Sequence, residues 1–209
     1  MFIFAKQVFK EAELMSLPDE IKHLDYKIFS KINGEWHNSF FDTVLPFLRQ
    51  SYLWIPFYLF LLIFAPLNFK KKGWYWSIFF LITAGLSDYI SSTIVKGTFL
   101  RLRPCQDPSL AEHLRLLVNY CPGNSSFTSS HAANHFAVAM YIFTTFKNEV
   151  SKWWGVLFLW AFIISYTQIY VGIHFAGDII GGAILGLMIG YFTGKFFIRQ
   201  IGLNQPENR

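Results

Sequence analysis

The stretch Gln168-Ile169-Tyr170-Val171-Gly172-Ile173-His174-Phe175-Ala176-Gly177-Asp178 joins two long apolar runs near the end of the chain. The runs, Trp153–Ile173 and Ala176–Ile198, are each long enough for a helix that crosses a bilayer core of roughly 30 Å. A histidine and an aspartate at such a junction are expensive to place beside hydrocarbon, so they are candidates for a function. The pattern predicts two membrane helices that meet at a polar, functional junction.

Three further apolar runs precede this pair: Tyr52–Phe69, Trp74–Lys96 and Ala132–Phe146. The 209-residue sequence is 53% hydrophobic and 20% aromatic, and only 15% of it is charged, compared with roughly 25% in an average soluble domain. A soluble protein can bury one or two such helices, but not five with so little polar surface. We therefore predict an all-α integral membrane bundle of about five spans. The formal net charge is +5, and its cations flank apolar runs, which favours lipid headgroups over nucleic acid as partners.

The first 43 residues have a different composition, in which lysines alternate with acidic residues. Among them Leu24, Ile28 and Ile32 recur at a spacing of four, which is typical of an amphipathic helix. We expect this segment to lie on the membrane surface. The predicted organisation is an interfacial segment over residues 1–43, a membrane domain over 44–200 and a polar tail over 201–209.

Counting spans predicts which polar segments share a side of the membrane. Lys96–Arg103 follows the second span, His131 opens the third, and His174 closes the fourth, so all three are expected on one side. The opposite side carries the basic residues Lys70, Lys71, Lys72, Lys147, Lys152, Lys195 and Arg199. The positive-inside rule then places the three polar segments on the extracytoplasmic side, most simply of a bacterial inner membrane.

The first segment offers two cations. Lys96 and Arg103 are seven residues apart, so a continuous helix would place them on one face, with Pro104 ending it. A compact ammonium and a forked guanidinium would then converge on one phosphoryl group. The alternative is that both side chains simply extend to the membrane–water interface.

The second segment, Thr128-Ser129-Ser130-His131, is a helix N-cap signal directly before an apolar run. Free amides and the positive dipole end at a helix start bind phosphate readily, although capping alone would explain the hydroxyls. His135 is four residues after His131, an HxxxH spacing that can bind a metal. No carboxylate or suitably spaced cysteine accompanies the pair, so no metal is expected.

In the third segment His174 and Asp178 are four residues apart. A carboxylate bonded to one ring nitrogen fixes the tautomer and makes the other nitrogen a better nucleophile or base. The alternative is a structural pair at a turn, but coincidence is implausible for three such segments together.

With these segments the chain resembles the type 2 phosphatidic acid phosphatase superfamily of membrane lipid phosphatases, whose pattern is KxxxxxxRP, PSGH and SRxxxxxHxxxD. Lys96, Arg103 and Pro104 match the first part in full, and Ser129 and His131 match the second. In the third part His174 and Asp178 match, but Thr167-Gln168 replaces Ser-Arg. The resemblance covers roughly residues 44 to 199, with the amphipathic segment in place of the first span of six-span members.

The resemblance implies roles for the matching residues. His174 would be the nucleophile that forms a phosphohistidine, oriented by Asp178, and His131 would protonate the leaving oxygen. The phosphoryl oxygens would be held by Lys96, Arg103, Ser129 and the backbone near Ser130, without a metal or another cofactor. Gln168 lacks the charge of the family arginine but retains an amide donor, and Arg101, with Arg115 behind it, is the predicted compensating cation.

The expected function is hydrolysis of a lipid phosphate or pyrophosphate: an isoprenoid pyrophosphate, phosphatidylglycerol phosphate or a lipid A phosphate. Two alternatives remain. One is a phosphotransferase that passes the phosphoryl group from lipid to lipid, and the other is a catalytically weak lipid-phosphate binder, which the Gln168 substitution motivates.

The two cysteines of the chain, Cys105 and Cys121, flank one loop between the second and third spans. On an extracytoplasmic face they could pair, which would hold Arg103 near His131. Two unpaired thiols are the alternative.

Overall fold

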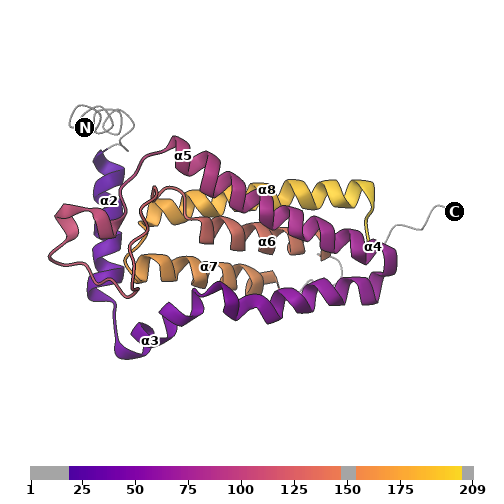
Figure 1. The fold of residues 1–209 in the computed structure, drawn as a ribbon, viewed down its shortest axis with the longest axis horizontal. Helices are drawn as coiled ribbons and strands as arrows, with labels where there is room; N and C mark the ends of the chain where they lie inside the picture. Colours follow the sequence, from indigo (N-terminus) through magenta and orange to yellow (C-terminus); the bar gives the residue numbers. More distant parts are fainter. Residues whose placement is uncertain (1–18, 147–153, 204–209) are drawn as a thin grey trace.

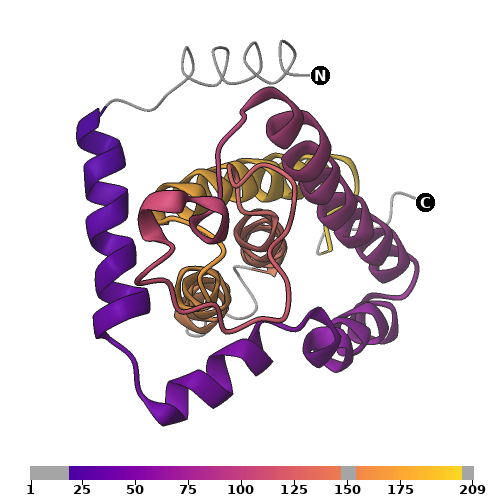
Figure 2. The ribbon, with the colours of Figure 1, turned by 60° about the vertical axis from the view of Figure 1, so that its left-hand side comes forward.

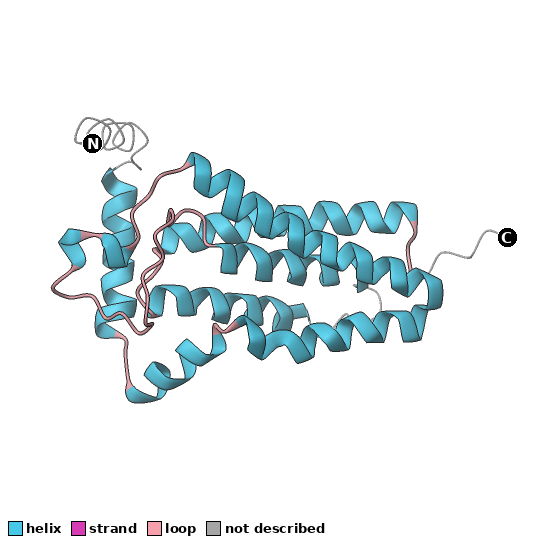
Figure 3. Ribbon diagram, in the orientation of Figure 1, coloured by secondary structure: helices cyan, strands magenta, loops and turns pink. Residues whose placement is uncertain are grey.

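The computed structural model describes residues 19–146 and 154–203, and the regular secondary structure of these residues is entirely helical. In chain order the elements are α2 (Asp19–Phe29), the π-helix η1 (Ser30–Glu35), α3 (Ser39–Leu48), η2 (Ser51–Trp54), α4 (Ile55–Tyr89), the π-helix η3 (Ile90–Val95), α5 (Lys96–Thr98), η4 (Pro104–Gln106), η5 (Pro108–Leu110), α6 (Ser130–Phe146), α7 (Trp154–Tyr170) and α8 (Ala176–Gln200). Figure 3 shows the long helices running side by side, with the longest loops gathered at one end.

The element α4 is a helical hairpin. Lys70 has a φ of 50°, outside helical geometry, and the chain reverses direction there. In Figure 1 the two arms of α4 run out along the bundle and back. The arms touch, because Ser77 Oγ donates to the Leu62 carbonyl at 3.2 Å and a Cβ on Gly73 would lie 2.0 Å from the Ala65 carbonyl oxygen.

The described residues of all five predicted spans are mainly helical, although the fourth helix ends at Tyr170 and not at Ile173. Not all five are equally strong as membrane spans. Among the described residues, two helical stretches are long and apolar enough to cross a bilayer, Ser51–Thr98 and Ala176–Gln200. Ser51–Thr98 includes both arms of α4, while Gly155–Tyr170 is a shorter apolar helix. The all-helical prediction is confirmed, and the number of crossings stays a prediction.

The bundle is built on a close contact between α6 and α8. A stripe of glycines, Gly182, Gly186, Gly190 and Gly194, faces α6 at a spacing of four. A Cβ on Gly186 would lie 2.2 Å from the Ala133 carbonyl oxygen, and one on Gly190 would lie 2.2 Å from that of Ala137. No side chain fits at these positions without moving backbone, so the two helices approach as closely as their main chains allow.

The N-terminal helix α2 lies across the loop end of the bundle (Figures 1 and 2). Its buried side consists of Asp25 and Phe29, followed by Ile32 and Asn33 in η1. Residues 19–35 are helical, with Ile32 buried and Leu24 55% exposed, and the position of this segment on the membrane surface stays a prediction. Packing against α8 favours the neighbouring face, which carries a carboxylate.

The predicted domain boundaries and the polar tail are only partly covered by the structure. Residues 1–18 and 204–209 lie outside the described residues, and so do Lys147 and Lys152. The helix α3 runs through the predicted domain boundary between residues 43 and 44.

Candidate active site

The three sequence segments meet at a loop that the sequence did not single out, residues 124–126. The Ser125 carbonyl accepts hydrogen bonds from Lys96 Nζ at 3.0 Å and from Arg103 Nη2 at 3.3 Å. Ser126 Oγ donates to Asp178 Oδ2 at 2.5 Å, and its backbone N–H donates to the Arg101 carbonyl at 2.9 Å. This loop therefore joins the cations of the first segment to the carboxylate of the third.

Lys96 and Arg103 converge, but not in the way the spacing predicted. The helix ends at Thr98, and Phe99 is extended, so the expectation of one continuous helix is wrong. Arg103 is itself extended, with φ −82° and ψ 157°, as the residue before a proline prefers. The loop returns Arg103 to the same carbonyl that Lys96 contacts, and both side chains are buried.

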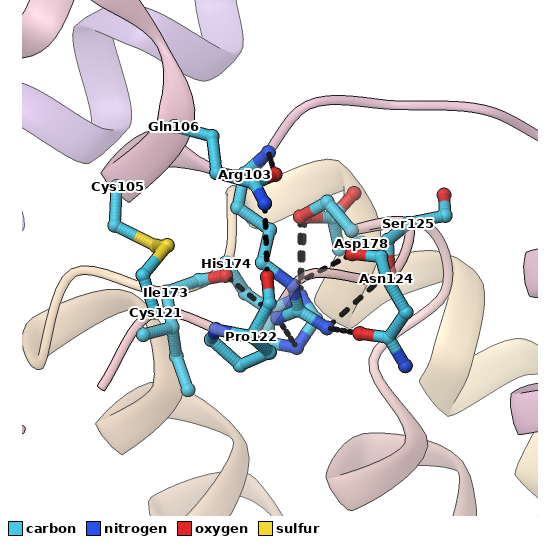
Figure 4. The surroundings of a disulfide bond; sticks show 11 residues. Arg103, Cys105, Gln106, Cys121, Pro122, Asn124, Ser125, Ile173, His174 and Asp178 are labelled. Atoms are coloured by element: carbon cyan, nitrogen blue, oxygen red, sulfur yellow. Dashed lines mark hydrogen bonds and ion pairs between the residues drawn. A yellow bond between two sulfur atoms is a disulfide. The ribbon is translucent and has the colours of Figure 1, made fainter.

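His174 lies in the short loop between α7 and α8, directly beside Arg103 (Figure 4). Arg103 Nη1 is 3.0 Å from His174 Nε2, and since a guanidinium can only donate, Nε2 must be the acceptor. The ring proton is then on Nδ1, which faces Asp178 Oδ2 at 3.3 Å. Burial lowers the pKa of His174 to about 4, against the raising influence of Asp178, so the ring is neutral at pH 7 with its lone pair on Nε2.

Asp178, at the start of α8, is fully buried and held from several sides. Its Oδ2 accepts from Ser126 Oγ and from the backbone N–H of Phe175 at 2.8 Å. Its Oδ1 accepts from Arg101 Nη1 at 2.7 Å. A carboxylate fixed in this way holds the imidazole of His174 in one orientation.

Arg101 bridges two carboxylates instead of standing free. Its Nη2 lies 2.6 Å from Asp25 Oδ2 on α2, and its guanidinium lies 4.4 Å above the Phe175 ring. Asp25 Oδ1 also accepts from the backbone N–H of Gly177 at 2.7 Å. The sequence-based prediction assigned Arg101 to phosphate binding, whereas its contacts favour a role in positioning Asp178.

The start of α6 supplies the second segment. Ser129 Oγ accepts from the Ala132 N–H at 3.4 Å, as an N-cap does, and the Ser129 N–H donates to the Asp178 carbonyl at 3.0 Å. Ser130 Oγ is buried without a hydrogen-bond partner. His131 lies close enough to Lys96 for the charge of that lysine to act on it.

No metal cluster accompanies these histidines within residues 19–146 and 154–203, where no three His, Cys, Asp or Glu side chains gather. The expected HxxxH partner, His135, is used elsewhere. Its Nδ1 lies 2.8 Å from the His131 carbonyl oxygen and its Nε2 lies 3.4 Å from Tyr58 Oη.

Gln168 is fully buried on α7. Its side-chain nitrogen lies 3.3 Å from the Ile164 carbonyl and 3.2 Å from Thr167 Oγ1, both on the same helix. Its backbone carbonyl accepts from the N–H of His174 at 3.2 Å, which shapes the loop that carries the histidine.

The disulfide between Cys105 and Cys121 is present, which confirms the predicted pairing. Figure 4 shows it beside the loop that carries Arg103. Gln106 reinforces the connection, because its Nε2 donates to the Pro122 carbonyl at 3.0 Å and its Oε1 accepts from the Arg103 N–H at 3.3 Å.

Sequence reasoning missed Ser126, Asn124 and Asp25. Asn124 holds Arg103 by its side-chain oxygen, at 2.7 Å from Nη2, and by its carbonyl, at 3.0 Å from Nε. Loop residues such as these leave no periodic signal. Asp25 could have been found from helix periodicity. It precedes Phe29 by four residues, so both lie on the same face of the helix, and both are buried.

Comparison with known proteins identifies the family. The model of the PAP2 superfamily matches residues 74–201, a stretch that contains all three segments. The chain therefore belongs to the PAP2 superfamily.

Relatives agree with this assignment over most of the chain. A lipid A 4′-phosphatase of Porphyromonas gingivalis is 28% identical over 198 residues, which cover 90% of this chain and 80% of that protein. A lipid A 4′-phosphatase of Bacteroides thetaiotaomicron is 29% identical, with coverage of 79% and 73%. An undecaprenyl-diphosphatase of Bacillus subtilis is 25% identical, with coverage of 83% and 84%.

Two solved structures share the fold. LpxE of Aquifex aeolicus has a TM-score of 0.64 and 27% identity, and covers 82% of this chain and 95% of its own. A transmembrane PAP2-type phosphatidylglycerolphosphate phosphatase of Bacillus subtilis has a TM-score of 0.68 at 18% identity, with coverage of 97% and 98%. The chain is thus a membrane protein of the lipid phosphatase class.

Proposed function

We propose that this protein hydrolyses a phosphate monoester or pyrophosphate on a lipid through a phosphohistidine formed on His174. The observation that carries the proposal is the arrangement at Nε2 of His174. In the structure this atom accepts a hydrogen bond from the buried guanidinium of Arg103. On substrate binding the guanidinium would donate to a phosphoryl oxygen instead, which would leave the lone pair on Nε2 free to attack phosphorus.

The first step would form a bond between Nε2 and phosphorus and break the bond from phosphorus to the lipid oxygen. His131, protonated once the negatively charged substrate is bound, would give its proton to that oxygen. In the second step water would attack phosphorus and return a proton to His131, and the phosphate would leave His174 neutral. Asp178 stabilises the positive charge that the imidazole carries between the two steps.

The negative charge on phosphorus would be held entirely by protein groups. Lys96 and Arg103 already share one carbonyl, so their positive ends lie close together. Ser130 Oγ, buried and without a partner, is free to donate to a phosphoryl oxygen, with Ser129 and the first amides of α6 beside it. Such preorganised donors stabilise charge in phosphoryl transfer without a metal.

A phosphate of lipid A is the substrate that we favour among the lipid phosphates. It is supported by the similarity to two lipid A 4′-phosphatases along most of their length. The extracytoplasmic leaflet is the proposed location of the site. The Cys105–Cys121 disulfide supports this, because disulfides persist in oxidising compartments.

The test is inorganic phosphate release by the purified protein from lipid A, undecaprenyl diphosphate and phosphatidylglycerol phosphate, with His174→Ala as the control. We expect release from at least one of them and none from the variant. Transfer of labelled phosphate to a second lipid would instead support a phosphotransferase. Binding of all three lipids without release would refute the hydrolase.

A further inference from the structure

Arg49, at the end of α3, is a buried cation without a counter-charge. Only 4% of the surface of Arg49 is exposed, and its Nε has no hydrogen-bond partner. Its guanidinium donates one long hydrogen bond, from Nη2 to Tyr120 Oη at 3.4 Å. The Cζ atom also lies 5.9 Å from the centre of the Tyr120 ring. Within the described ranges no carboxylate pairs with it. Burying an unpaired charge is costly, so a partner absent from the protein itself is expected.

Arg49 lies beside the loop that carries Arg103. Its partner Tyr120 directly precedes Cys121, and the disulfide joins Cys121 to Cys105, two residues after Arg103. Burial lowers the pKa of Arg103, Asp178 and Tyr120 oppose that change, and the charge of Arg49 adds to it. The charge of Arg49 also acts on His131. Arg49 is therefore within interaction range of both a phosphate-holding cation and the proposed proton donor.

The charges at the site do not balance without substrate. Arg101 is neutralised by Asp25 and Asp178, which it bridges. One of these two carboxylates offsets the charge of Arg101, and the other offsets one further cation. Since Lys96, Arg103 and Arg49 are three cations and His174 is neutral, a net charge of about +2 remains. A phosphate monoester carries about −1.5 to −2 at pH 7, so it matches this surplus.

The chain lacks the arginine that the family pattern places at position 168. Gln168 cannot supply charge, and its amide nitrogen is bonded within α7. Arg101, which the sequence offered as the substitute, is bound to two carboxylates. Arg115, the second substitute, is paired with Asp42 at 2.6 Å. Among the described residues, Arg49 is then a buried cation without a carboxylate partner, at the end of α3.

We propose that Arg49 is a phosphate-binding residue of this enzyme and supplies from α3 the positive charge that Gln168 lacks. This inference rests on the proposed function and assigns its ligand: a phosphoryl oxygen of the lipid substrate. On binding, the unpaired Nε and the weakly held Nη2 would become charge-assisted donors to that oxygen.

The test compares Arg49→Gln and Arg49→Lys with Arg199→Gln, an equal loss of charge at the far end of α8. We expect kcat/KM for the lipid substrate to fall about 10- to 100-fold in Arg49→Gln and less in Arg49→Lys, with Arg199→Gln unchanged. The affinity for orthovanadate, measured as a shift in thermal unfolding, should fall by a similar factor.

The unfolding temperature measured without ligand distinguishes a phosphate-binding role of Arg49 from a structural one. Because Arg49 is unpaired, Arg49→Gln should leave the unfolding temperature unchanged or raise it. Arg49→Gln/Gln168→Arg, which returns the arginine to the family position, should recover part of the lost activity.

The inference is overturned if Arg49→Gln keeps normal kcat/KM and vanadate affinity. It is also overturned if the variant loses stability while its vanadate affinity is unchanged, since Arg49 would then be structural. Absence of phosphate release by the wild-type protein would instead count against the proposed function, and the vanadate measurement would still decide the role of Arg49.

Discussion

Asp25 Oδ2 and Arg101 Nη2 lie 2.6 Å apart, and this ion pair connects helix α2 to Asp178, the carboxylate proposed to orient His174. The other terminal nitrogen of Arg101 is 2.7 Å from Asp178 Oδ1. The guanidinium of Arg101 is thus shared between Asp25 and Asp178. Because its single positive charge faces two carboxylates, it neutralises neither of them completely. Helix α2 is thus connected to His174 through Arg101 and Asp178, although it lies outside the matched family region.

Asp25→Asn keeps the shape of the side chain but removes its charge, so Arg101 would pair with Asp178 alone. Asp178 would then support the imidazolium of His174 less well, and we expect kcat to fall about tenfold with little change in KM. Steady-state kinetics on the preferred lipid phosphate provide the measurement. Glu20→Gln, an exposed charge on the same helix, is the control. Equal activity of the two variants would show that α2 has no such influence.

Ser126→Ala tests the shortest bond to the catalytic carboxylate. Ser126 Oγ donates to Asp178 Oδ2 at 2.5 Å and lies 3.3 Å from His174 Nδ1. Without it Asp178 keeps the Phe175 amide and Arg101 but loses one restraint, so we expect kcat to fall about tenfold. Ser51→Ala, an exposed hydroxyl, should behave as wild type. A Ser126→Ala enzyme with normal kcat would remove this serine from the mechanism.

A covalent phosphohistidine should be trapped when labelled substrate is quenched at alkaline pH. His174→Ala should show no labelled protein, whereas Asp178→Asn should show a reduced amount, because the nucleophile is still present. Peptide mapping of the label would identify the residue. Label on a residue other than His174, or full activity in His174→Ala, would contradict the proposed chemistry.

The pH dependence follows from the neutral state of His174. Burial lowers its pKa to about 4, so the reactive neutral ring is present above that pH and is lost as the pH falls through it. With an aryl phosphate, whose leaving group needs no proton, phosphoenzyme formation should decline near pH 4 and not near 6.5. Single-turnover rates between pH 3.5 and 8 measure this. A decline centred near 6.5 would mean that His174 titrates as an exposed histidine does.

Loss of the disulfide should affect both stability and activity. Cys105 and Cys121 close a loop with a sequence separation of 16, which we expect to contribute about 3 kcal/mol to the free energy of unfolding. Cys105→Ser/Cys121→Ser should therefore unfold more easily. It should also raise KM, since the bridge lies beside the Arg103 loop (Figure 4). Denaturation with and without reductant, and kinetics of both forms, test this. Unchanged KM in the double variant would limit the bridge to a structural role.

The sequence allowed the helices and the three polar segments to be predicted because both are local signals. Apolar runs such as Ala176–Ile198 determine the helices, and the junction between two runs places His174 and Asp178 four residues apart. The sequence showed that the two cysteines flank one loop and could pair, and the structure contains the disulfide between them.

The parts that were not predicted depend on contacts distant in sequence. Ser126 and Asp178 are 52 residues apart, and Arg101 and Asp25 are 76 apart. The predicted path of the chain from Lys96 to Arg103 was wrong. The prediction continued the helix to Pro104, whereas the backbone leaves the helix after Thr98 and is extended at Phe99. A spacing rule holds only while the helix continues, and the loop brought the two cations together by a different route.

The glycine stripe on α8 also determines where a lipid can enter. A Cβ at Gly182, Gly186 or Gly190 would lie 2.2 to 2.5 Å from a carbonyl oxygen of α6 or of the residue before it. An acyl chain is far wider than this, so it cannot pass between these two helices. If the proposed site binds a lipid phosphate, the headgroup must enter while its tails remain on another side of the bundle, since α6 and α8 form a closed wall along this contact. Substrate selection by tail length or number would then depend on the remaining helices, and substitutions along α4 and α7 are where such selectivity should change.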